Sequence, residues 1–159
     1  MDVEPKIHVF EWRITGFPEL REALSSDPHK HYSSITSEAF SAGSMAWCFR
    51  VYPNGHSIQG VGDQALSIFF GISDFEKLNK GWQRVVHLEI MLVNHLGAHL
   101  SVIKRPSKVT ILSKYQPDWG YARFVDLTKL TKEEGYLSYD GDLLLEAKLT
   151  LLRVRATTC

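Results

Sequence analysis

Apolar and polar residues alternate along most of this chain. In "HVFEWRIT", Phe10, Trp12 and Ile14 share one phase, while Glu11 and Arg13 take the other. This period of two is typical of a half-buried β-strand, because successive side chains of a strand point to opposite faces. The same alternation recurs in "MAWCFRVY", "ALSIFF", "RVVHLEIMLVN", "VTILSKY", "YARFVDL" and "LLLEAKLTLLRV". We therefore expect a strand in each of these segments.

Turn-forming residues separate the expected strands, and helix-forming segments are scarce. Pro53-Asn54-Gly55 follows one strand, and Asp140-Gly141-Asp142 precedes the last one. "FPELREAL" allows one or two helical turns with Pro18 in the first turn. "LTKLTKEEG" allows another short helix that Gly135 would end. Seven or eight short strands separated by turns predict an all-β fold, an antiparallel β-sandwich.

The composition narrows the class of protein. A chain of 159 residues with 44% hydrophobic content is long enough for one globular domain with its own core. Lys plus Arg equals Asp plus Glu at 18 each, which argues against a nucleic-acid binder, since such proteins carry a basic excess. No apolar run approaches the length of a membrane span, and the N-terminus lacks a signal-peptide pattern. We expect an intracellular protein, cytoplasmic or nuclear, that binds neither nucleic acid nor membrane.

The segment "DWGYARF" contains two large aromatic residues, and the alternation bears on which of its side chains face the core. Phe124 and Gly120 fall in one phase, and Trp119, Tyr121 and Arg123 fall in the other. If Phe124 belongs to the core, Tyr121 and Arg123 face outward. For Trp119 the pattern leaves two alternatives open: it faces outward as well, or a bend or bulge at Gly120 turns it inside.

Phe69 presents a similar case on another expected strand. Its neighbours Ile68 and Phe70 share the core phase with Leu66, so the alternation places Phe69 on the outer face. One exposed aromatic residue needs no explanation, but several on one face form an apolar patch, and such patches usually mark binding sites.

Candidate catalytic and metal-binding groups are few. His95 and His99 have the spacing of a helical zinc site, but Gly97 and the preceding strand argue against a helix there. The sequence contains no nucleophile elbow, P-loop or dinucleotide-binding fingerprint, and nothing marks a base partner for Cys48. We expect no catalytic residue, no metal site and no cofactor.

An ordered set of motifs resembles the MATH (meprin and TRAF homology) domain. "FEWRITGFPEL" matches the opening W-x-I-x-x-F element, and "SEAFSAGSMAWCFRVYPNG" matches the following block that ends in V-Y-P-x-G. "ALSIFF", "LEIMLVN", "DWGYARF" and "EEGYLSYDGDLLLEAKLTL" match the later elements in the same order. The resemblance covers roughly residues 7–155, with residues 1–6 and 156–159 as flanking termini.

The resemblance implies an eight-stranded sandwich that binds short extended peptides along the edge of the D-W-G-[FY] strand. Transferred onto this chain, the implied peptide-binding residues are Phe69, Leu88, Ile111, Asp118, Trp119, Gly120, Tyr121 and Ala122. For Leu88 the phase shared with Ile90 and Leu92 indicates the core instead. Strand addition would supply main-chain hydrogen bonds, and alternate peptide side chains would set specificity.

The resemblance also implies a role and a kind of ligand. Expected partners are motifs that contain Ser or Thr together with Pro and Ala, whose hydroxyl or N–H groups would donate to Asp118. Ala122 and Pro117 stand where the adaptor branch of the family has lysines, which argues against a preference for acidic flanks. The implied role is recruiting substrates to ubiquitin ligases or deubiquitinases. The alternatives are a TRAF-type oligomeric adaptor and a regulatory domain of a larger ubiquitin-specific or meprin-like protease.

Overall fold

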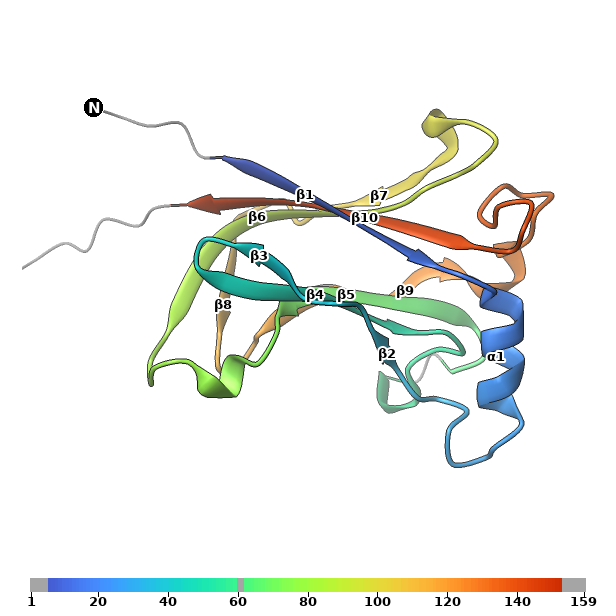
Figure 1. The fold of residues 1–159 in the computed structure, drawn as a ribbon, viewed down its shortest axis with the longest axis horizontal. Helices are drawn as coiled ribbons and strands as arrows, with labels where there is room; N and C mark the ends of the chain where they lie inside the picture. The colour runs from blue at the N-terminus through green and yellow to red at the C-terminus, as the bar shows by residue number, and fades with distance from the viewer. Residues whose placement is uncertain (1–5, 60–61, 153–159) are drawn as a thin grey trace, which may run out of the picture.

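A computed structural model describes residues 6–59 and 62–152 of the chain and shows two packed β-sheets (Figure 1). The expected domain end at residue 155, residues 1–5 of the expected N-terminal flank (1–6) and the C-terminal flank 156–159 lie outside these residues. The first sheet has the order β1 (Ile7–Ile14), β10 (Leu143–Leu152), β6 (Gln83–Leu92) and β7 (Val102–Lys104), with β8 (Thr110–Ser113) also paired to β6. The second has the order β2 (Ile35–Thr36), β4 (Met45–Tyr52), β5 (Ala65–Ile72) and β9 (Asp118–Asp126), with β3 (Phe40–Ala42) paired to β4.

All of these strand pairs are antiparallel, which confirms the predicted all-β sandwich. The described residues form ten strands rather than seven or eight, because β2, β3 and β7 have only two or three residues each. Alternation over so few residues leaves no detectable pattern in a sequence.

The core lies between the sheets and consists of the inward phases predicted from the sequence. Trp47 and Phe49 of β4, Phe70 of β5, Ile90 of β6 and Leu145 of β10 are fully buried. The rings of Trp47 and Phe70 stack with centroids 6.0 Å apart. Burying one such side chain contributes about 1.5–3 kcal/mol, so the inward phases fix which face of each strand points inward.

Regular helix is limited to α1 (Phe17–Ser25) and four 3₁₀ turns within the described residues: η1 (Ser57–Gln59), η2 (Phe75–Lys77), η3 (Ala98–Leu100) and η4 (Leu127–Lys129). The first predicted helix is α1, with proline in its first turn and Phe17 buried. The second predicted helix, over "LTKLTKEEG", forms only as the short turn η4, and the prediction is wrong beyond it. Leu127 and Leu130 both turn into the core, and the chain leaves helical geometry at Leu130 with φ −83° and ψ 70°.

Candidate functional site

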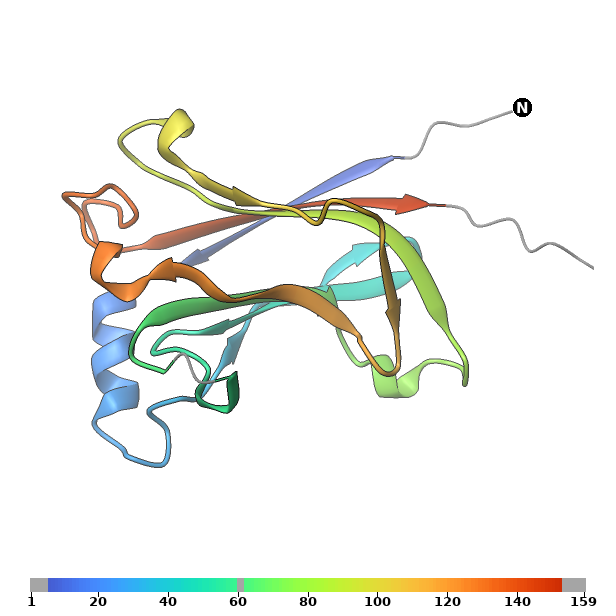
Figure 2. The same ribbon diagram turned by 180° about the vertical axis from the view of Figure 1, so that it is seen from behind.

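β9, which contains the D-W-G-Y segment, is the last strand of the second sheet and runs beside β5 (orange in Figure 2). No strand among the described residues pairs with its other side. Such an edge presents a row of backbone N–H and C=O groups that can pair with another chain. The D-W-G-Y segment therefore lies on an edge that no strand of the described residues covers.

An irregular β-bulge separates two parts of the pairing between β9 and β5. Leu66 pairs with Val125 and Ile68 pairs with Tyr121, so Ser67 alone lies opposite residues 122–124. The hydroxyl of Ser67 donates to the Ala122 carbonyl at 2.7 Å and ties the looped-out segment to β5. The buried Phe124 belongs to this looped-out segment, so it does not share the phase of Tyr121 and Val125, which pair with the buried Ile68 and Leu66. The alternation carried back from Phe124 therefore fails.

The bulge overturns the predicted orientation of Tyr121. Tyr121 lies opposite Ile68 and Trp119 lies opposite Phe70, and directly paired residues share one face of a sheet. Both β5 partners are fully buried, so both β9 aromatics point to the inner face. The outward prediction for Tyr121 is therefore wrong. For Trp119 the inward alternative holds, although the bulge lies at residues 122–124 and not at Gly120.

Trp119 and Tyr121 are half-buried and close the open side of the sandwich. Their rings meet edge to face with centroids 5.0 Å apart, and Tyr121 also contacts the buried Phe124. Lys104 of β7 reaches across from the first sheet, with Nζ 4.8 Å from the centre of the Tyr121 ring and 5.2 Å from that of Phe124. The two aromatics thus combine packing on the core with some exposure at the edge.

Phe69 lies on the outer face of the second sheet, as its phase predicts. It pairs with Arg50 of β4 on one side and with Gly120 of β9 on the other. Its ring meets that of Tyr52 edge to face at 6.0 Å, and the His56 ring lies 4.2 Å from Tyr52. Phe69, Tyr52 and His56 form an aromatic cluster beside β9.

Glycines leave the surface between this aromatic cluster and the edge of β9 without projecting side chains. A Cβ atom at Gly120 would lie 2.1 Å from the Ile68 carbonyl oxygen, and one at Gly71 would lie 2.4 Å from the Asp118 Cα. Both contacts are with backbone, so only glycine allows β5 and β9 to approach this closely. The strip beside Phe69 therefore has no side chain at position 120, and the edge of β9 can be reached over it.

The pairing pattern shows which backbone groups of β9 are available. The Ile72 N–H donates to the Pro117 carbonyl at 3.0 Å. Hydrogen-bonded pairs then recur at every second position, at Phe70–Trp119 and Ile68–Tyr121. The backbone groups of Asp118 and Gly120 consequently point away from β5, toward the edge that is unpaired among the described residues.

Both ends of this edge are closed to further pairing. Pro117 has no N–H to donate, and its carbonyl accepts from β5. At the other end the Ala122 carbonyl accepts from Ser67, and the Arg123 carbonyl accepts from Lys104 Nζ at 3.0 Å. The pairing edge is therefore short and runs from Asp118 to the start of the bulge.

Asp118 begins the edge in a partly desolvated position. Burial raises the pKa of its carboxyl group, and the nearby Arg50, its own N–H and His56 oppose that shift. A carboxylate held in such surroundings gains from any ligand donor that replaces the lost water. Beside it, burial raises the pKa of the Cys48 thiol, which makes Cys48 a poor nucleophile at neutral pH.

Two residues implied by the resemblance lie away from β9. Leu88 is 2% exposed and faces the core from β6 in the first sheet, so it does not lie beside the edge of β9 in the second sheet. Ile111 is 54% exposed on β8, on the side opposite the buried Thr110 and Leu112. The structure therefore brings together Phe69 and residues 118–122, leaves Ile111 on the preceding strand, and removes Leu88 from the site.

Two residues near the site, Tyr52 and Lys104, belong to no sequence motif that predicts their contacts. Tyr52 follows the outward phase of its strand, so its exposure could have been predicted, but its contact with Phe69 depends on the pairing of β4 with β5. Lys104 lies in a three-residue strand and reaches the other sheet. Only the three-dimensional arrangement reveals either contact.

Two features are absent from residues 6–59 and 62–152. No cluster of three or more His, Cys, Asp or Glu residues with metal-binding geometry occurs there. No helix in those ranges is long and apolar enough to cross a membrane.

Comparison with known proteins identifies the fold. The sequence profile of the MATH domain family matches residues 9–149, which is most of the chain. The chain belongs to the MATH domain family. The MATH fold is a protein-interaction fold and is not itself catalytic.

Relatives of this MATH domain occur in proteins of several architectures. A MATH domain and coiled-coil domain-containing protein of Arabidopsis thaliana is 27% identical, over 80% of this chain and 39% of that protein. Ubiquitin C-terminal hydrolase 12 and TNF receptor-associated factor homolog 1b of the same plant are each 26% identical, over 95% and 92% of this chain. The chain spans only 12% of each of these two proteins.

A solved structure shows the same fold. The TRAF5 structure of Notothenia coriiceps superposes with a TM-score of 0.66 over 94% of this chain and 76% of that one, at 18% sequence identity. This likeness supports the TRAF-like sandwich.

Proposed function

We propose that this MATH domain binds short extended peptides by pairing them with the edge of β9. The peptide backbone exchanges hydrogen bonds with Asp118 and Gly120. Its outward side chains pass over Gly120 toward Phe69, and its inward side chains lie against Trp119 and Tyr121. Main-chain pairing supplies sequence-independent affinity, and the flanking aromatics supply specificity.

The observation that carries the proposal is the short accessible edge beside an aromatic cluster. A structural edge strand is usually covered, or blunted by charged residues and proline. Here proline and the bulge close only the two ends, while Asp118 and Gly120 keep their outward backbone groups. Motifs with Ser or Thr suit this edge, because a hydroxyl can donate to the partly desolvated carboxylate of Asp118.

A peptide of this length gains limited affinity from one site. Micromolar binding corresponds to about −8 kcal/mol, so single-site complexes would exchange quickly. Linking several copies raises the effective affinity without any new contact. The domain would therefore act best in a protein that presents more than one copy of it or of its ligand.

In the whole protein we assign the domain the role of a non-catalytic recruiter of substrates to ubiquitin ligases or deubiquitinases. Its similarity to a segment of a ubiquitin C-terminal hydrolase supports this assignment. Similarity to a TNF receptor-associated factor homolog supports the alternative of an oligomeric signalling adaptor. A regulatory domain of a larger protease is a further form of the same binding role.

The proposal is tested with an array of extended peptides rich in Ser, Thr, Pro and Ala, probed with the 159-residue chain. Phe69→Ala is the diagnostic variant, because Phe69 lies outside the core while Trp119 and Tyr121 pack on it. Tyr139→Ala is the matched control, since Tyr139 is an exposed aromatic on another loop. We expect Phe69→Ala to weaken array hits at least about tenfold, the loss of one buried aromatic contact.

Equal unfolding midpoints for the wild type and Phe69→Ala would show that any loss of binding is local. Tyr139→Ala should bind like the wild type. If the wild type selects no peptide, or if Phe69→Ala binds every hit unchanged, the proposed site is wrong.

A further inference from the structure

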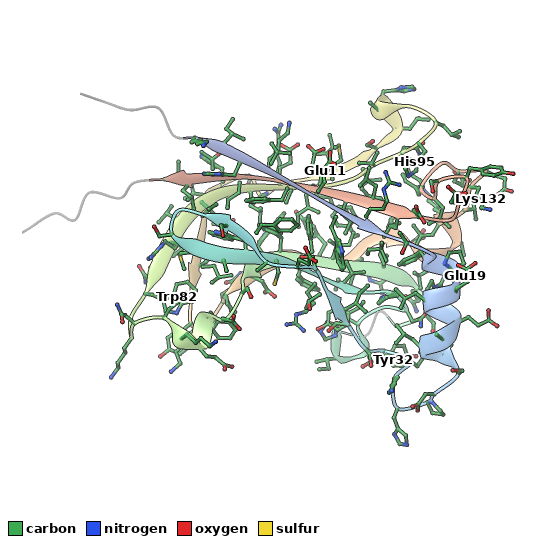
Figure 3. All side chains as sticks on the ribbon, in the orientation of Figure 1. Glu11, Glu19, Tyr32, Trp82, His95 and Lys132 are labelled. Atoms are coloured by element: carbon green, nitrogen blue, oxygen red, sulfur yellow. The ribbon has the colours of Figure 1, made fainter. Side chains whose placement is uncertain are left out.

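A pocket of about 480 Å³ lies between the β5–β6 connection and the turn that joins β8 to β9. Its walls combine the apolar side chains Phe75, Leu78 and Trp82 with a polar rim. Such a mixture, mostly apolar with a few polar groups, is typical of sites that hold a side chain or small ligand. Trp82 is 8% exposed and forms the interior of the pocket, at the left of the molecule in Figure 3.

The pocket lies directly beyond one end of the β9 edge. Lys114 of its rim is in the turn that leads into β9, and Phe75 follows the end of β5 by three residues. Since Gly71 near the end of β5 pairs with Asp118 at the start of β9, the two wall segments extend from the same end of the strand pair. Figures 1 and 2 both show η2 next to the β8–β9 turn.

The rim of the pocket is more basic than the edge itself. Lys80 and Lys114 are exposed on it, with Glu76 as the opposing charge. Tyr115, adjacent to Lys114, is 93% exposed and offers a further aromatic surface. The chain lacks lysines at positions 117 and 122, where the resemblance implies them. It carries positive charge instead at Lys80 and Lys114, past the end of the edge.

We propose that this pocket receives an apolar side chain of the same peptide that pairs with β9, from the segment that runs past Asp118. Acidic residues on either side of that side chain meet Lys80 and Lys114. The inference rests on the proposed function and adds a second anchoring point. A peptide with an apolar residue between acidic ones at one end then binds better than the paired segment alone.

The continuity of the path favours this occupant. The pairing of a peptide with β9 ends at Pro117, which offers no N–H, so the rest of the peptide leaves the edge there. The next surfaces it meets in that direction are the β8–β9 turn and the pocket behind it. Anchoring an apolar residue there adds buried area without a second binding event, which raises affinity at little entropic cost.

The test uses one array hit extended at either end. One set of peptides carries Glu-Leu-Glu at the N-terminal or the C-terminal end, and the control set carries Ser-Gly-Ser at the same places. We expect Glu-Leu-Glu to strengthen binding at one end only, by about tenfold over Ser-Gly-Ser, from one buried leucine and weak ion pairs. Fluorescence titration of the wild-type chain measures each affinity.

Reversing the charge of the two rim lysines tests whether the gain in affinity depends on the pocket. The double variant Lys80→Glu with Lys114→Glu should lose at least about fivefold of the tenfold gain while binding the Ser-Gly-Ser peptides like the wild type. Lys30→Glu is the matched control, because Lys30 is an exposed lysine on the loop after α1. It should keep the full gain.

The outcomes separate the two proposals. If neither extension strengthens binding, or if the rim variant keeps the whole gain, the pocket has no part in peptide binding, while the edge proposal stands on the binding of the unextended hit. If no peptide on the array binds the chain at all, both proposals fail together.

Discussion

Asp118 is the residue at which stability and binding make opposite demands. Burial raises the pKa of its carboxyl group despite the opposing effect of Arg50. A raised folded-state pKa means that the ionised form destabilises the fold at neutral pH. The structure keeps this charged group at the start of the pairing edge, which is the pattern expected of a residue retained for binding.

We predict that Asp118→Asn is more stable than the wild type at pH 7 and binds peptides less tightly. The wild type recovers stability as pH falls through its raised folded pKa toward the ordinary value of 3.8, because protonation removes the buried charge. The advantage of the variant should therefore shrink as pH falls from 7 to 4. Urea unfolding at the two pH values measures it, and a variant less stable at pH 7 would contradict this account.

At the residue scale, the sequence predicted orientation only where a strand is regular. Phe69 sits between core residues of an unbroken strand, and its outward phase is confirmed. Tyr121 precedes a bulge, and the phase carried back from Phe124 placed it on the wrong face. Nothing in "YARF" marks the extra residues, because the bulge is defined by the partner strand and by Ser67.

At the scale of elements, the pairing of β5 with β9 depends on the absence of side chains at two positions. Gly120 and Gly71 each face the backbone of the opposite strand at a distance that no Cβ atom tolerates. Because Gly120 has no side chain, none projects at this position between Phe69 and the edge of β9. The element that carries the site is thus shaped by packing between strands.

We predict that Gly120→Ala destabilises the domain by about 3 kcal/mol, since its Cβ meets backbone atoms that must move. Gly81→Ala is the control, because Gly81 has φ +80° but open space around its Cβ position. It should lose only about 1 kcal/mol, from the left-handed backbone. Urea unfolding compares the two, and a Gly120→Ala loss no greater than the control would refute the close contact.

The sequence predicted the longer strands where the alternation of apolar and polar residues extended over many positions. The strands of eight or more residues, with Pro18 at the start of α1, were visible in the pattern. The short strands and η4 were not, because two or three residues carry no period and Leu130 leaves the helix to reach the core. Tertiary packing decided these elements.

At the scale of the whole molecule, the sandwich and the family were predictable, and the neighbours of each strand were not. Alternation predicts strands, but the order of strands in each sheet depends on contacts between distant segments. The motif resemblance supplied the site strand, and the structure then corrected its details. Leu88, implied by that resemblance, faces the core as its own phase indicated.

The central claim is that a bound peptide forms hydrogen bonds with the outward backbone groups of β9. Amide hydrogen exchange by NMR, with and without an array-selected peptide, tests it most directly. The account predicts that the Gly120 N–H gains protection on binding, while Trp119 and Tyr121, whose N–H groups already pair with β5, change little. Protection confined to the first sheet, with Gly120 exchanging as fast as in the free protein, would contradict the account.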